Sequence, residues 1–214
     1  MKITILGGTG YVGSHIAQEA ASRGLEVNVV ARKMPSSDSP TPNSSLHYMV
    51  GDATDLEKLP QLVEGSDVIV SALSPRGSMV GHVLPTNKAL AQIAASEKIR
   101  LIVIGGYSAM RLEPHGLRIA EKGKLPDWLA DEAKEMAAVI DWLENSAPAD
   151  LQWLYVSPAQ NFSATSGTET TGHYFVSDDV VRVRDSVISV EDLALGIVDE
   201  IVRREHSGHI LLRS

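Results

Sequence analysis

Short apolar runs alternate with stretches of helical periodicity along almost the whole chain. We predict strands over Lys2–Leu6, Glu26–Ala31, Leu46–Val50, Asp67–Ala72, Arg100–Gly105, Leu151–Val156 and Gly208–Leu212. We predict helices over Tyr11–Arg23, Asp55–Glu64, Leu84–Lys98, 126–145 and Val190–Arg204. Near-continuous apolar strands separated by helices are typical of a parallel sheet that is covered on both faces. With right-handed crossovers, this order predicts an α/β fold built on a doubly wound parallel sheet.

The first strand runs directly into a glycine-rich turn that opens the first helix. Gly7 allows a sharp turn, Gly10 has no Cβ to block a phosphate, and Gly13 lets the helix pack closely on its strand. The free amides and the positive end of the helix then attract a diphosphate. The alternative is an ordinary tight turn of another α/β protein. We predict a Rossmann-type site whose cofactor-binding residues here are Gly7, Thr9, Gly10, Tyr11, Val12 and Gly13.

Three segments interrupt the alternation: 34–45, 107–125 and 160–186. The first is rich in Ser and Pro and is expected to be a loop beside the second strand. The second has mixed charge and several turn residues, which favours an active-site loop. In the third we expect a small hairpin whose arms, 174–176 and 180–183, flank Asp178 and Asp179.

The length of 214 residues suits one domain with a substantial core. We find no internal repeat and no linker that would separate two independent units. The sequence therefore predicts a single Rossmann domain over residues 1–214 with a small C-terminal substrate-side region. The substrate-side elements are expected to come from about 107–126 and 160–188.

Composition narrows the partners and the chemistry. The 19 Lys and Arg against 27 Asp and Glu give a net charge of −8, which argues against a nucleic-acid partner. The absence of cysteine excludes disulfides, thiolate catalysis and thiolate metal ligands. The histidines lack metal-ligand spacing, so we predict no metal site. No apolar run approaches the ~20 residues of a membrane span, so we expect a cytoplasmic protein without a membrane partner.

The end of the second strand indicates which cofactor is preferred. In dinucleotide folds an acidic residue at this point binds the 2′-hydroxyl of NAD. This chain has Arg32 and Lys33 there instead. A guanidinium and an ammonium suit the extra phosphate of NADP, which a carboxylate would repel. The alternative is that both are solvated surface cations. We predict NADP as the cofactor, with NAD as the second choice.

Further cofactor contacts are expected where later strands end. Asp52 and Ala53 follow the third strand, where they can meet the adenine edge, although Asp52 equally suits a turn. Thr54 or Asp55 is expected to cap the next helix. Small residues after the fourth strand leave room for the cofactor, and a proline follows the sixth strand in the expected nicotinamide pocket. The predicted contacts here are Ala72, Leu73 and Pro158.

These features together resemble a known family. The glycine turn, the basic end of the second strand, Gly51-Asp52-Ala53-Thr54-Asp55 and Ile188-Ser189-Val190-Glu191-Asp192-Leu193-Ala194 are similar to those of atypical short-chain dehydrogenases/reductases. Within that family, the chain resembles the NAD(P)H-binding group that includes NmrA-like proteins, biliverdin reductase B and bacterial NADH-flavin reductases. The resemblance spans nearly the whole chain and implies fold and cofactor more firmly than substrate.

The catalytic pair of typical family members is absent. They carry Tyr-x-x-x-Lys, in which the lysine lowers the tyrosine pKa so that the phenol can exchange a proton with substrate. The residues four positions after the five tyrosines here are His15, Asp52, Arg111, Ala159 and Asp178. We therefore reject the usual ketone/alcohol mechanism. Tyr107 and Ser108, just beyond the fifth strand, are the candidates to orient or protonate an acceptor. Alternatively, they are only a polar strand end with a packing aromatic.

The sequence thus favours an NADP(H)-dependent oxidoreductase that reduces a flavin, a quinone or a similar small planar acceptor. Such a reaction needs mainly the placement of the hydride against the acceptor. The alternative is a non-catalytic NAD(P)-binding redox sensor that signals to a partner protein. A nucleotide-sugar epimerase is disfavoured by the missing pair. We keep a homodimer as an alternative to a monomer, and we expect Trp128 and Trp142 to be core or interface residues.

Overall fold

The computed structural model describes residues 1–33, 44–122 and 125–214, and it centres on one eight-stranded sheet. The strand order is β3-β2-β1-β4-β5-β6-β8-β7. The strands are β1 (Lys2–Leu6), β2 (Glu26–Ala31), β3 (Leu46–Val50), β4 (Val68–Ser71), β5 (Arg100–Ile104), β6 (Trp153–Pro158), β7 (Phe175–Ser177) and β8 (Gly208–Arg213). Strands β1 to β6 and β8 pair in parallel, and β7 pairs antiparallel with β8. The order 3-2-1-4-5-6 is that of the doubly wound Rossmann fold, so the predicted fold class is confirmed.

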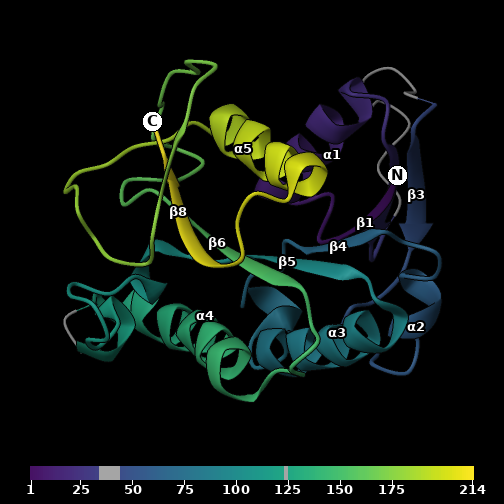
Figure 1. The fold of residues 1–214 in the computed structure, drawn as a ribbon, viewed down its shortest axis with the longest axis horizontal. Helices are drawn as coiled ribbons and strands as arrows, with labels where there is room; N and C mark the ends of the chain where they lie inside the picture. The colour runs from purple at the N-terminus through teal and green to yellow at the C-terminus, as the bar shows by residue number, and fades with distance from the viewer. Residues whose placement is uncertain (34–43, 123–124) are drawn as a thin grey trace.

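Helices cover both faces of this sheet, as Figure 1 shows. The α-helices are α1 (Tyr11–Ser22), α2 (Leu59–Leu62), α3 (Val83–Glu97), α4 (Asp127–Ser146) and α5 (Val190–Arg203). Short 3-10 helices are η1 (Gly77–Met79), η2 (Tyr107–Ala109) and η3 (Ile119–Lys122). Helices α1 and α5 lie side by side on one face, whereas α2, α3 and α4 lie on the other. Within the described ranges, no helix combines the length and the apolarity that crossing a membrane would require.

The alternation of side chains along the strands divides the core between these two layers. Val68 and Val70 of β4 pack into the cluster that contains the buried side chains of α1 and α5. Ile69 between them packs into the other cluster, with α3 and α4. All three are fully buried, which is the expected burial of a parallel strand with helices on both sides.

The predicted helix over 55–64 is wrong in its first half. Turns occupy the segment before Leu59, and α2 begins after Lys58 as N-cap, so neither Thr54 nor Asp55 caps it. Pro60 stands in the first turn of α2. Because proline has no N–H to donate to the preceding turn, it cannot continue a helix from 55 onward and instead starts one.

The predicted hairpin in the 160–186 segment is also wrong. Residues Phe175–Ser177 form β7, which pairs with the end of β8 instead of with 180–183. The second expected arm turns toward the segment after β5 instead, where Arg111 donates its amide to the Asp179 carbonyl and its own carbonyl accepts the Val181 amide, both at 2.8 Å. The open edge of β8 therefore outcompetes the local turn as a pairing partner. Most of the predicted 34–45 loop lies outside the described residues.

Candidate functional site

A groove opens at the carboxyl ends of the central strands, where the strand order reverses between β1 and β4. Ligands of doubly wound folds bind at this switch point. The groove encloses about 230 Å³. It is lined by Gly7, Thr9, Gly10, Val30, Ala31, Arg32, Gly51, Asp52, Ala53, Ala72, Leu73, Ser74 and Met79. Most of the predicted cofactor contacts are therefore brought together along one surface.

The glycine turn forms the inner wall of the groove. Gly7 has φ +76°, a left-handed conformation that favours glycine, and its carbonyl accepts the Gly10 amide at 2.9 Å. A Cβ on Gly13 would overlap the Gly7 carbonyl and lie 2.9 Å from the Gly8 Cα. Gly10 is the N-cap of α1 and offers no side-chain cap to the first amides of that helix. These amides and the positive end of α1 are consequently available to an anion.

The basic end of β2 forms the outer part of the groove. Arg32 lines it and donates a hydrogen bond from Nη1 to the Ser78 hydroxyl of η1. Lys33 is exposed and is not part of the lining. Of the two cations singled out in the sequence, the structure therefore brings only the guanidinium to the groove.

Asp52 faces the groove and also stabilises its own turn. One carboxylate oxygen accepts from the Thr54 amide at 2.9 Å and from the Thr54 hydroxyl at 2.8 Å. These two hydrogen bonds lower the pKa of Asp52, and the charges of Arg32 and His82 lower it further. Asp52 therefore does stabilise a turn, which was the alternative role considered for it from the sequence. The second carboxylate oxygen accepts no hydrogen bond from the residues that the structure describes.

Four other predicted cofactor residues lie away from the lining. The Tyr11 ring stacks on Phe162 with centroids 5.9 Å apart, and Val12, also in α1, packs against the core cluster beneath that helix. Gly13 is buried under the turn, where its contribution is close packing. Pro158 is buried at the end of β6 and pairs with Leu212 of β8.

Tyr107 and Ser108 come just beyond β5, after Gly105 and Gly106, and form η2 with Ala109. Both are half-buried, and neither lines the groove described above. Burial raises the pKa of Tyr107, and the nearby Arg184 charge only partly offsets this. The phenol is therefore neutral at physiological pH and is a poorer proton donor than the tyrosine of a Tyr–Lys pair.

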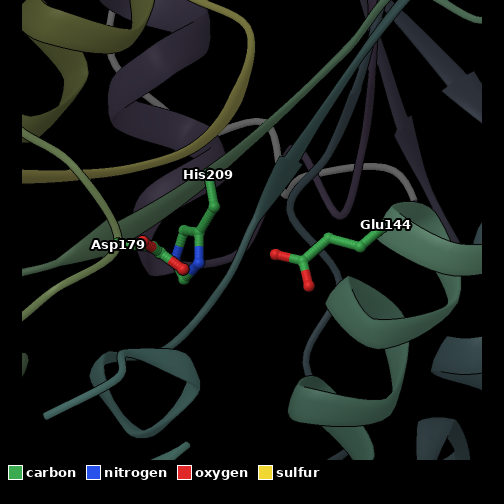
Figure 2. A group of neighbouring side chains, drawn as sticks. All are labelled: Glu144, Asp179 and His209. Atoms are coloured by element: carbon green, nitrogen blue, oxygen red, sulfur yellow. The ribbon is translucent and has the colours of Figure 1, made fainter. Parts of the chain in front are cut away.

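The structure also contains a second polar cluster, which was not predicted from the sequence. Figure 2 shows Asp179 beside His209, with the Glu144 carboxylate pointing toward both from α4. Ligand atoms of these three side chains lie within 4.8 Å of one another, as in a metal site. However, Arg111 binds both carboxylates, to Glu144 at 2.8 Å and to Asp179 at 3.0 Å. Fully buried Arg118 binds Glu144 at 2.6 Å, so guanidinium groups already occupy the place of a cation.

His209 connects this cluster to the loop that carries Tyr107. Its Nε2 is 2.8 Å from the Ser157 hydroxyl, which donates to the Gly106 carbonyl at 2.9 Å. Burial, together with the Arg118 and Arg111 charges, lowers the pKa of His209 to about 3. The imidazole is therefore neutral. Nδ1 faces the Arg118 guanidinium at 3.5 Å and therefore accepts a hydrogen bond from it. The ring proton is consequently on Nε2, which donates a hydrogen bond to the Ser157 hydroxyl.

Comparisons with known proteins agree with this geometry. A family model described as NAD(P)H-binding matches residues 7–203. The chain is 26% identical over 213 residues to the uncharacterized protein YwnB of Bacillus subtilis, covering 97% of this chain and 95% of that one.

Two solved structures are similar over nearly the whole chain. One is a “putative NADH-flavin reductase” of Streptococcus pneumoniae, with TM-score 0.86, 25% identity and coverage of 100% of this chain and 99% of that one. The other is a “putative epimerase” of Bacteroides thetaiotaomicron, with TM-score 0.82, 25% identity and coverage of 99% and 96%.

Proposed function

Because the chain belongs to the NAD(P)H-binding family, we propose that it is an NADP(H)-dependent oxidoreductase that reduces a flavin, a quinone or a similar planar acceptor. The observation that carries the proposal is one groove that joins the glycine turn to the Arg32 guanidinium. The first element suits a diphosphate, and the second suits a further phosphate on the adenosine ribose. The 25% identical Streptococcus pneumoniae protein described above gives the flavin class further support.

The residues of the groove fit a dinucleotide by their shape and their free donors. A Cβ on Gly7 would lie 2.6 Å from the Ala72 carbonyl oxygen, so the turn and the end of β4 approach closely only because that side chain is missing. The uncapped first turn of α1 leaves amide donors for the diphosphate. Arg32 forms no ion pair with a carboxylate among the described residues, so its charge is free to bind an anion.

In this proposal the chain mainly binds and orients. The bound cofactor supplies the hydride. The amides of α1 hold the diphosphate, and Asp52 offers its second oxygen to the adenine amine. Ala72 and Leu73 leave space at the end of β4 for the middle of the dinucleotide. Tyr107 and Ser108 flank the acceptor as neutral hydrogen-bonding groups, so water supplies the proton of the reduced product.

Titration calorimetry with NADPH and NADH tests the cofactor part. We expect tighter binding of NADPH, and we expect Arg32→Ala to remove most of that preference while NADH affinity stays nearly unchanged. Lys33→Ala is the matched control, because this cation does not line the groove. Equal or tighter binding of NADH by the parental protein would contradict the NADP assignment, and no binding of either would refute the dinucleotide site.

Steady-state oxidation of NADPH with FMN, riboflavin and quinones tests the catalytic part. Turnover with at least one acceptor is the expected result. Tight binding of NADPH without turnover on any acceptor would contradict the reductase and favour the redox sensor instead. In that case, a partner protein retained only with NADPH or only with NADP⁺ would identify the signalling role.

A further inference from the structure

The 3-10 turn η1 forms the outer wall of the adenosine end of the groove. It follows β4, and its Met79 side chain is buried and lines the groove. Its neighbour Ser78 is exposed and accepts the hydrogen bond from Arg32 Nη1. A side chain at the end of β2 and one in the loop after β4 thus meet at the mouth of the groove, although they are 46 positions apart in the sequence.

Contacts on the far side hold this turn in place independently of Arg32. Arg76 binds Glu132 of α4 through two hydrogen bonds, at 2.9 and 3.1 Å. Just after the turn, the amides of Gly81 and Val83 donate to the Glu135 carboxylate at 2.9 and 2.8 Å. Since both ends of the turn are fixed to α4, the Ser78 hydroxyl stays near the groove when Arg32 changes its partner.

The two side chains together offer the donors that a phosphate needs. A guanidinium has five N–H donors, and a serine hydroxyl has one O–H donor and two lone pairs. When Arg32 donates one N–H to Ser78, the hydroxyl proton and the remaining guanidinium donors have no partner within 1–33, 44–122 and 125–214, so they can bind an anion. Asp52, the nearest carboxylate in the lining, has one oxygen held by Thr54.

We propose that Ser78 is a specificity-determining residue that binds the 2′-phosphate of NADP(H) together with Arg32. This inference rests on the proposed function and adds a second element to it. The loop after β4, together with the end of β2, would bind the extra phosphate. In the absence of the phosphate, Ser78 holds Arg32 at the mouth of the groove. In its presence, both side chains donate to the phosphate oxygens.

Binding of adenosine fragments isolates this end of the groove from the chemistry. We would measure 2′,5′-ADP and 5′-AMP, then NADP⁺ and NAD⁺, by calorimetry on the parental protein and on Ser78→Ala. A hydrogen bond to a charged group contributes about a factor of ten in affinity. We expect Ser78→Ala to weaken 2′,5′-ADP and NADP⁺ by about tenfold and to leave 5′-AMP and NAD⁺ within about twofold.

Three further variants separate the hydroxyl from the shape of the turn. Ser78→Thr keeps the hydroxyl and should retain NADP⁺ affinity. Ser78→Asp places a carboxylate beside Arg32 and should weaken NADP⁺ more than Ser78→Ala does, while NAD⁺ affinity is spared. Ser96→Ala is the matched control, because Ser96 is an exposed serine of α3 that bonds only the Ile93 carbonyl among the described contacts.

The outcomes distinguish this inference from the proposed function. If Ser78→Ala binds NADP⁺ as tightly as the parental protein, the role of Ser78 is refuted while the dinucleotide site stands. If Ser78→Ala weakens NAD⁺ and NADP⁺ equally, the residue supports the groove without reading the phosphate, which also overturns the inference. If the parental protein binds neither dinucleotide, both proposals fail together.

Discussion

Gly13→Ala should destabilise the protein even though it adds a good helix former to α1. The new Cβ would overlap the Gly7 carbonyl and approach the Gly8 Cα to 2.9 Å, and both neighbours are backbone atoms that cannot rotate away. Inserting a methyl into such a packed site costs about 3 kcal/mol. The gain in helix propensity from glycine to alanine returns about 1 kcal/mol. The steric cost therefore exceeds the gain in helix propensity, and the free energy of unfolding should fall by about 2 kcal/mol.

Thermal unfolding followed by circular dichroism measures this loss. For a chain of this length, a net loss of about 2 kcal/mol lowers the Tm by about 4 to 8 °C. Urea unfolding at 25 °C gives the free energy of unfolding directly and should show the same sign. A Tm equal to or above that of the parental protein would refute the packing argument, because only the helix-propensity gain would then remain.

Gly10→Ala is the informative companion. Gly10 has φ −75° and ψ 173°, which any residue adopts, and its Cβ would meet only the Gly7 carbonyl oxygen, at 3.1 Å. We expect a Tm change below about 2 °C. The added methyl lies at the groove, so NADPH affinity should nevertheless fall by about tenfold or more, as for a loss of about 1.4 kcal/mol. Gly13→Ala should thus mainly lower stability, whereas Gly10→Ala should mainly lower cofactor affinity.

Two further predictions concern buried polar contacts away from the groove. Because the folded pKa of His209 is about 3, below its usual 6.5, only the unfolded chain binds a proton between these values. The free energy of unfolding should therefore fall as pH drops from 6.5 toward 4.5, by up to about 1.4 kcal/mol per pH unit. In urea unfolding across this range, His209→Gln should show a shallower slope, and equal slopes would contradict the assignment. Ser189 caps α5 by accepting the Asp192 amide at 3.0 Å, so Ser189→Ala should cost about 1 kcal/mol in urea unfolding, and Ser189→Thr should restore most of it. Unchanged stability of the alanine variant would exclude the cap.

The sequence predicts those parts of the fold that depend on local signals. The strands are apolar runs with clear ends, and the glycine turn is one contiguous segment. The sequence alone therefore predicts β1, α1 and the glycine turn that forms the inner wall of the groove. The N-cap of α5 is equally local, because the Ser189 hydroxyl accepts the amide of Asp192, three positions further along the chain. Each of these features is decided by residues only a few positions apart.

The errors and omissions share a dependence on distant partners. Residues 174–183 have the composition of a hairpin, but the free edge of β8 gives Phe175–Ser177 a better partner than their neighbours do. The Arg32–Ser78 contact joins two loops of different strands. Likewise, Arg118 and His209 meet across 91 positions, and no periodicity connects them. Such contacts follow from the completed sheet, so a single sequence does not reveal them.

The pairing of α1 with α5 has a consequence for the order of folding during synthesis. Helix α1 precedes α5 by well over 150 residues along the chain, so it leaves the ribosome long before α5 does. Arg23 at the end of α1 binds Asp199 of α5 at 2.6 Å, and the apolar faces of the two helices share one core. Until translation reaches α5, the nascent chain therefore displays the uncovered side of α1. The glycine turn at the start of that helix gains its final support only when α5 has emerged.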